Sequence, residues 1–271
     1  MPYPLVLTAF EVRYPSTPRL RSVLTSLAEA MSHRLPDISR DKEGALGRTS
    51  LGFGAHRGLT EPALMTMANP ERTEVCTVRD NVVALEVTQY ASYEDFRALI
   101  GDFLHALYRT EAIISIDRVG IRYLDELRTG TVEGASDWAE WIRPELVSPL
   151  NLATDYTVLN YTGTLRFQLD HDCFLSLRWG ALRRPALRQS MSTGLRIRRP
   201  NGSAPVFMLD LDGAWVPDSA TKFDDIEKVL SATDRLHSAI KQLFASSVQE
   251  QLLEQIASGG SAIQGEEGVA R

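Results

Sequence analysis

The residues best suited to chemistry are arginines and aspartates that share strand faces. Arg118 and Arg122 are four residues apart in one strand-like segment, with Gly120 between them, so both side chains point to the same side. Asp210 and Asp212 are two residues apart and share a face in the same way. Guanidinium groups bind anions through paired hydrogen bonds, and paired carboxylates bind Mg²⁺ or exchange protons. These four side chains are therefore the first candidates for a ligand site.

A structural role explains the same residues. Strand-like segments after residue 155 supply further arginines, which would pair with the aspartates across neighbouring strands. Gly120 would let a ligand approach the backbone, yet an ordinary solvated face would also tolerate it. The sequence leaves two interpretations open, a salt-bridge network or a ligand site that comprises Arg118, Arg122, Asp210, Asp212 and Arg166.

Other catalytic signatures are missing from the sequence. Cys76 and Cys173 lie in separate apolar segments without zinc or redox spacing, so we expect buried free thiols. The histidines lack a metal-binding spacing, and no G-x-S-x-G occurs. The stretch LDHDC (169–173) could surround a divalent cation, but a polar hairpin tip explains it as well. We predict no catalytic residues, no metal and no cofactor.

Composition limits the class of protein. The chain has 271 residues, of which 44% are hydrophobic and 24% charged, as expected for one large or two small folded domains. A net charge of −6 argues against general nucleic-acid or anionic-membrane binding. No apolar run approaches the roughly 20 residues of a membrane span, and the N-terminus lacks the basic start of a signal peptide. We expect a soluble cytoplasmic protein and leave its oligomeric state open.

The residue pattern of the first half of the chain predicts the element order β-α-β-β-α-β. Strand patterns cover 5–14, a hairpin over 74–90, and 118–127. The second helix should begin at Ser92, because Asp95 three residues later completes an acidic capping box. This order is that of a ferredoxin-like split unit, in which two helices cover one face of an antiparallel sheet.

The residue pattern of the second half predicts another antiparallel sheet followed by a long helix. Strand patterns occur at 156–170, 173–182, 193–199 and 206–215, and a helical stripe runs from 223 to 244. The glycine-rich stretch 44–58 predicts a loop of open role. We therefore expect an α+β fold of two tandem modules: a ferredoxin-like module over 1–127, a connection over 128–154, a second sheet with the long C-terminal helix over 155–258, and a disordered tail over 259–271.

Three phrases resemble one bacterial family in their order along the chain: QYASYEDF (89–96), RVGIRYLDEL (118–127) and FMLDLDGAW (207–215). They match an aromatic helix start with Ser and Glu, a Gly-hydrophobic-Arg-Tyr strand, and a late Leu-Asp-hydrophobic-Asp strand. The chain thus resembles a sporadically distributed, uncharacterised family of bacterial cytoplasmic proteins. The resemblance implies a patchy occurrence, which often accompanies defence or biosynthetic gene clusters, and it supplies no catalytic residues.

Two classes of function stay open. The first is a non-catalytic binding or accessory protein that recognises a protein or peptide partner, in a defence or natural-product gene cluster. The second is an enzyme with a site between the modules, where Arg118 and Arg122 bind an anion and Asp210 and Asp212 bind a metal or transfer protons. Convergence of these side chains in a concave pocket would favour the enzyme, and mutual salt bridges on a flat face would oppose it.

Overall fold

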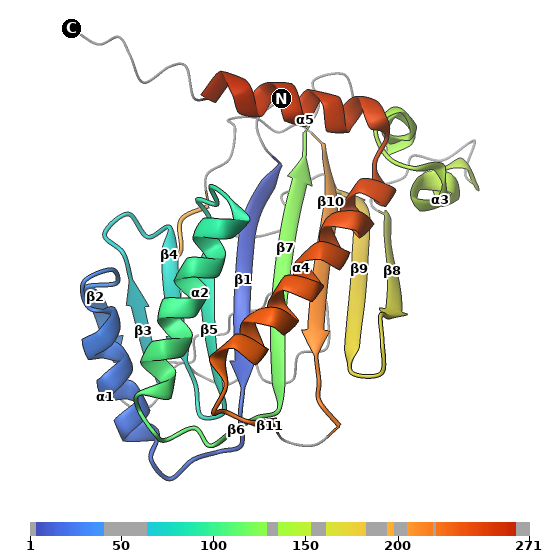
Figure 1. Cartoon of the computed structure of the whole chain (residues 1–271). Helices are drawn as coiled ribbons and strands as arrows, with labels where there is room; N and C mark the ends of the chain where they lie inside the picture. The colour runs from blue at the N-terminus through green and yellow to red at the C-terminus, as the bar shows by residue number, and fades with distance from the viewer. Residues whose placement is uncertain are drawn as a thin grey trace, which may run out of the picture.

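The computed structural model describes residues 4–40, 64–128, 135–152, 161–182, 194–197, 205–218 and 221–263. Its main feature is a nine-stranded antiparallel sheet (Figure 1), with the strand order β2-β3-β4-β5-β1-β7-β10-β9-β8. The strands are β1 (Leu5–Arg13), β2 (Asp37–Arg40), β3 (Met65–Ala68), β4 (Glu74–Val78), β5 (Val82–Val87), β7 (Arg118–Leu127), β8 (Tyr161–Gln168), β9 (Cys173–Leu182) and β10 (Val206–Trp215). A separate ribbon pairs β6 (Ser115–Ile116) with β11 (Thr221–Lys222).

Helices cover one face of this sheet (Figure 1). They are α1 (Leu20–Met31), α2 (Tyr93–Tyr108) and α4 (Ile226–Ser247), while α5 (Glu250–Ile263) crosses one end. The short helix α3 (Pro144–Val147) lies between two 3₁₀ segments, Ala135–Glu140 and Ser148–Leu152. The main hydrophobic core lies between the helices and the sheet, because the apolar stripe of each helix faces the strands.

The start of α2 confirms the predicted capping box. The Ser92 hydroxyl accepts a hydrogen bond from the backbone N–H of Asp95 at 3.1 Å and lies 2.8 Å from the Asp95 carboxylate. We expect Ser92→Ala to lower the free energy of unfolding by about 1 kcal/mol, because one N–H of the first turn loses its partner. Urea denaturation of both proteins measures this difference, and an unchanged midpoint would contradict it.

Helix α4 lies close to the sheet where β10 carries a glycine. A Cβ atom at Gly213 would lie 3.1 Å from Ile240 and 3.3 Å from Leu236, both on α4. The missing side chain therefore lets the helix approach the strand. The carboxylate of Asp225 caps α4 by accepting from the N–H of Lys228. The helix ends where Val248 becomes extended and forms a β-bridge with Ile142.

The α+β class and the antiparallel sheet are confirmed, whereas the tandem arrangement of two sheets is not. Strands β7 and β10 come from the two predicted modules, yet they are hydrogen-bonded neighbours, with Asp212 opposite Arg122. The halves therefore share one sheet. The first half has the order β4-β5-β1-β7, and β2 and β3 extend it at one edge. The ferredoxin-like description of residues 1–127 stays a prediction.

Several local predictions differ from the structure. Strands β2 and β3 occupy part of a region that had no clear pattern, while the predicted loop 44–58 lies outside the described residues. Of the strand predicted over 193–199, only 194–197 is described, and it is not part of the sheet. Helix α5 continues to Ile263, past residue 258 where we expected the folded chain to end, and residues 264–271 also lie outside the description.

The predicted connection contributes to the core. Trp138 is fully buried, and its ring lies 5.4 Å from that of Phe207 on β10. The indole N–H of Trp179 on β9 donates to the carbonyl of Leu146 at 2.7 Å. Residues 135–152 therefore pack against the sheet and do not act as a free linker. None of the described helices combines the length and the apolar character that crossing a membrane requires.

Candidate functional sites on the sheet and beside the long helix

The first candidate is the charged sheet face, which lies opposite the helices and carries arginines and carboxylates of β1, β7, β10 and β9. The Arg122 guanidinium donates from Nε and Nη2 to the two carboxylate oxygens of Asp210, at 2.6 and 2.7 Å. Arg178 lies 3.8 Å from the same carboxylate. The Asp210 side chain is only 4% exposed. This bidentate pair is therefore a nearly buried contact between neighbouring strands.

A second group of ion pairs continues across β1. Arg118 donates to Glu11 at 2.5 Å and lies 3.5 Å from a carboxylate oxygen of Asp212. Glu11 also accepts from Arg13 at 2.7 Å. Charges of both signs thus alternate along this face, and each of these four side chains has an oppositely charged neighbour.

Gly120 makes room for an arginine of the chain itself. A Cβ atom at this position would lie 2.6 Å from Nη1 of Arg118, which is closer than such atoms approach. The guanidinium of Arg118 therefore lies over the glycine to reach its carboxylate partners. The sequence had suggested that a ligand would use this space.

The ion pairs also affect titration on the charged sheet face. Burial acts to lower the pKa of Arg122, but the charge and hydrogen bonds of Asp210, with smaller contributions from Asp212 and Glu86, raise it above the ordinary value. Burial raises the pKa of Glu86 on β5, which β1 separates from β7, and the arginines Arg79 and Arg122 partly oppose that rise. Arg122 therefore stays charged, with Asp210 as its main partner.

Four of the five predicted ligand-binding residues thus come together. Arg118, Arg122, Asp210 and Asp212 meet as neighbours in one sheet, and not across a groove between two sheets. Arg166 is exposed on β8, where it is paired in register with Ser176. The role of these five residues in ligand binding stays a prediction.

The LDHDC stretch forms the tip of the β8–β9 hairpin. Asp170 accepts from the backbone N–H of Cys173 at 2.9 Å and from Arg235 at 2.9 Å. Asp172 accepts from the indole N–H of Trp215 at 2.7 Å. Carboxylate and thiol ligand atoms here lie within 4.8 Å of one another, but the contacts already account for a polar hairpin tip. Both cysteines are buried free thiols, as predicted, and burial raises the pKa of Cys173 to about 12.

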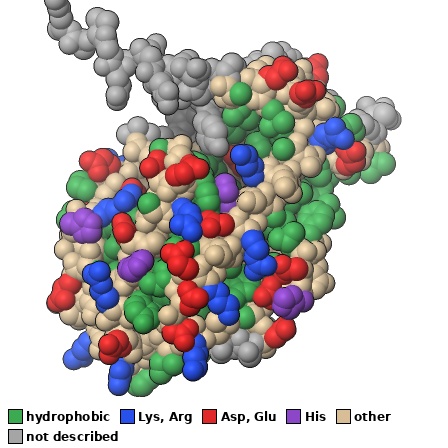
Figure 2. All heavy atoms as spheres, viewed as in Figure 1, with side chains coloured by type: hydrophobic (Ala, Val, Ile, Leu, Met, Phe, Trp, Pro, Cys, Tyr) green, Lys and Arg blue, Asp and Glu red, His purple; other side chains and the backbone are tan. Residues whose placement is uncertain are grey.

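The second candidate is an apolar surface on β8, the last strand of the described sheet. Leu165, Phe167 and Leu169, which we call the β8 patch, are 46%, 37% and 44% exposed. They alternate along the chain and therefore share a face. Helix α4 packs over β7 and β10, so the helical layer ends before it reaches β8 (Figure 1). Hydrophobic side chains gather at this edge of the molecule (Figure 2), whereas acidic and basic side chains intermingle over α2 and α4.

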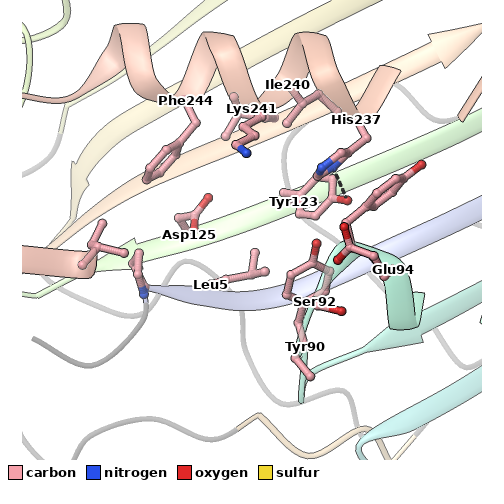
Figure 3. A pocket seen from close by; sticks show the side chains of 15 residues that line it. Leu5, Tyr90, Ser92, Glu94, Tyr123, Asp125, His237, Ile240, Lys241 and Phe244 are labelled. Carbon is pink, nitrogen blue, oxygen red and sulfur yellow. Dashed lines mark hydrogen bonds between the residues drawn. The ribbon is translucent and has the colours of Figure 1, made fainter. Parts of the chain in front are cut away.

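The third candidate is a pocket of about 330 Å³ between the sheet, α4 and the start of α2 (Figure 3). Its walls combine apolar and polar side chains. They comprise Pro4, Leu5, Tyr90, Ala91, Ser92, Tyr93, Glu94, Tyr123, Asp125, Leu211, His237, Ile240, Lys241, Phe244 and Ile256. A pocket with a few inward-facing polar groups is the usual form of a small-ligand site.

His237 is held in place by two tyrosines of this pocket. Its Nδ1 atom lies 2.9 Å from the Tyr123 hydroxyl, and its ring stacks on Tyr93 with centroids 3.6 Å apart. The Tyr93 hydroxyl donates to Asp234 at 2.6 Å, and Arg97 donates to the same carboxylate. Burial and the nearby Lys241 lower the pKa of His237. The imidazole is therefore neutral near pH 7.

Asp125 is the most unusual group in the pocket. Its side chain points into the cavity from β7 (Figure 3), and the residue is 5% exposed. Burial, with the nearby carboxylate of Asp210, raises the pKa of Asp125 to about 8. Sequence reasoning did not select this residue. The available signal was its position, because Asp125 continues the core-facing series of Ile121 and Tyr123.

Comparisons with known proteins identify no family for this chain. No protein-family model matches it, and no curated protein matches it. Among solved structures it is similar to Methanococcus jannaschii TBP, with 10% sequence identity and a TM-score of 0.28, over 88% of this chain and 97% of that chain. This TM-score is too low to support a shared fold or function.

Proposed function

We propose that the protein is a non-catalytic binding protein, which we expect in the bacterial cytoplasm, and that it recognises a protein or peptide partner at β8. The exposed β8 patch is the observation that carries this proposal. Among the described strands, β8 pairs only with β9, and the outer backbone N–H and C=O groups of such an edge strand can pair with an added strand. The partner would contribute an extended segment whose apolar side chains cover Leu165 and Phe167.

The chemistry of the patch defines the partner segment. Leu165 and Phe167 lie beside buried Leu177 and Leu175 of β9, so they prolong an apolar surface that the described helices no longer cover. Arg166 lies between these two residues and Gln168 follows them. Both side chains point to the other face of the strand and are exposed. A matching segment would therefore alternate apolar residues on one face with polar or acidic residues on the other.

The enzyme alternative has less support. It requires Arg118, Arg122, Asp210 and Asp212 to be available to a substrate, and these side chains form ion pairs with one another or with Glu11. Removing Arg122 would leave the nearly buried carboxylate of Asp210 without its bidentate partner, as expected of a structural network. A place in a defence or natural-product gene cluster remains part of the proposal, and the neighbouring genes would identify candidate partners.

Site-specific cross-linking in the host tests this function. With the photoreactive residue p-benzoylphenylalanine at position 167, we expect a discrete cross-linked product that contains a second protein. The matched control carries the same residue at Tyr108, an exposed aromatic position on α2 that is 47% exposed. The control should give no such product, and Leu165→Glu should reduce the product at position 167.

Two outcomes would decide against the proposal. Equal cross-linking from positions 167 and 108 would show that the β8 patch has no specific partner. A product that contains only two copies of this chain would assign the edge to self-association, which sedimentation velocity of the purified protein would then confirm as a concentration-dependent dimer.

A further inference from the structure

The pocket beside α4 is built around the carboxyl group of Asp125, for which the described residues provide no partner. Asp125 points into the cavity (Figure 3), and in the described part of the chain no hydrogen bond or ion pair reaches its carboxylate. Asp210, which is similarly buried, has the bidentate partner Arg122. Buried polar groups in native proteins nearly always have partners. An exception that lines a pocket therefore points to a ligand.

The charges around Asp125 favour a cation. Its burial and the Asp210 carboxylate on the other side of the sheet both oppose ionisation, and a positive ligand would relieve both effects. Helix α2 contributes Glu94 to the pocket, a second acidic group. Helix α4 contributes His237, which is neutral near pH 7, and Lys241, which forms no ion pair with Asp125 at 4.0 Å or less.

The walls suit a short alkyl chain beside an aromatic surface. Apolar lining of the pocket comes from β1, β10, α4 and α5, through Leu5, Leu211, Phe244 and Ile256. The rings of Tyr90 and Tyr123 meet edge to face at 5.8 Å, and aromatic faces attract cations. A volume of about 330 Å³ lies at the low end of the roughly 300–1,000 Å³ that is usual for ligand pockets. The ligand should therefore be small.

We propose that this pocket binds the ammonium group of a small aliphatic amine, with Asp125 as its counter-ion. The apolar walls hold the alkyl chain, and the carboxylate replaces the water that the ammonium loses. Asp125 is protonated in the free protein at neutral pH, so the proton leaves its carboxyl group as the amine binds. This site is independent of partner binding at β8.

Calorimetric titration at pH 7 with three probes of equal chain length tests the proposal. The probes are n-pentylamine, n-pentanol and pentanoate, which are cationic, neutral and anionic. We expect the amine to bind at least about tenfold more tightly than the alcohol, because only the ammonium group can form a charge-assisted hydrogen bond with the Asp125 carboxylate. Titrations in two buffers of different ionisation enthalpy should show close to one proton released per amine bound.

Variants identify the counter-ion. Asp125→Asn keeps the size of the side chain and should abolish both the amine preference and the proton release, while its thermal unfolding shows that the protein remains folded. Lys241→Met removes a like charge from the pocket and should tighten amine binding several-fold. A further titration with N-acetyl-lysine methylamide distinguishes the sources of the ammonium: equal affinity assigns a lysine side chain, and weaker affinity assigns a free amine.

Three results would overturn the proposal. Equal affinity for pentanol and pentylamine would show that charge is not recognised. Unchanged amine binding by folded Asp125→Asn would place the ammonium elsewhere. Tighter binding of pentanoate, with proton uptake, would make the pocket an anion site centred on Lys241.

Discussion

Asp125→Asn is expected to raise the free energy of unfolding at pH 9 by roughly 3–5 kcal/mol, because it removes a buried ionised carboxyl group. The folded state holds the proton of Asp125 up to about pH 8, whereas the unfolded chain releases it near its ordinary pKa of 3.8. This group therefore contributes most stability at low pH, and its contribution falls as the pH rises from about 4 to about 8.

Comparing the wild type with Asp125→Asn at several pH values separates the titration of Asp125 from that of all other groups. At pH 4 Asp125 is neutral in the folded state and only partly ionised in the unfolded chain, so the two proteins should differ by less than about 1 kcal/mol. Urea denaturation at pH 4, 6.5 and 9 measures the difference at each point. A constant difference at all three pH values would show that Asp125 does not titrate between pH 4 and pH 9 and would contradict a pKa raised by burial.

Arg122→Met is expected to lower the free energy of unfolding by about 3–5 kcal/mol, because it leaves Asp210 as a poorly compensated buried charge. Asp210 is 4% exposed and receives both of its short side-chain hydrogen bonds from Arg122. Arg178 remains at 3.8 Å and offsets part of the loss. Guanidinium denaturation of the wild type and the variant would measure this change in the free energy of unfolding. The comparison requires that the free energy depend on denaturant concentration with the same slope in both proteins.

Two further variants separate charge from packing. Arg166→Met removes an exposed arginine from the same face and should change stability by no more than about 0.5 kcal/mol. Adding Asp210→Asn to Arg122→Met should recover much of the lost stability, since the buried charge of Asp210 is then removed as well. If Arg122→Met cost no more than Arg166→Met, the ion pairs would contribute nothing, and a ligand-binding role for Arg122 would gain support.

Local features of the fold could be predicted from the sequence because they depend on neighbouring residues. Ser92 and Asp95 predict the start of α2, and the apolar stripe of that helix is buried as its spacing requires. The period-two pattern around Val119 and Ile121 likewise identifies a strand face packed beneath the helices. The class of the fold follows from these patterns.

Long-range pairing could not be predicted in the same way. The contact between β7 and β10 joins residues that are about 90 positions apart, and it decides that Asp210 meets Arg122 within one sheet. Nothing in either segment specifies that neighbour, because both read as ordinary half-buried strands. The prediction of two sheets with a groove between them is wrong because β7 and β10 pair within one sheet.

The pocket escaped prediction for a related reason. Asp125, Glu94 and His237 come from β7, α2 and α4, which are adjacent only after the chain has folded. A single aspartate at a core-facing strand position was the one local indication. The β8 patch was equally hidden, because whether Leu165 and Phe167 are covered depends on where α4 ends its contact with the sheet.

The central claim, strand addition at β8, is tested most directly by backbone amide exchange in a complex. Decapeptides selected from a random phage-displayed library against the wild type, and counter-selected against Leu165→Glu, provide the partner segment. We predict that a selected peptide alternates apolar residues and slows amide exchange within Tyr161–Gln168, as a new hydrogen-bonded strand requires. Selected peptides that leave exchange in this strand unchanged and protect another surface would contradict the account.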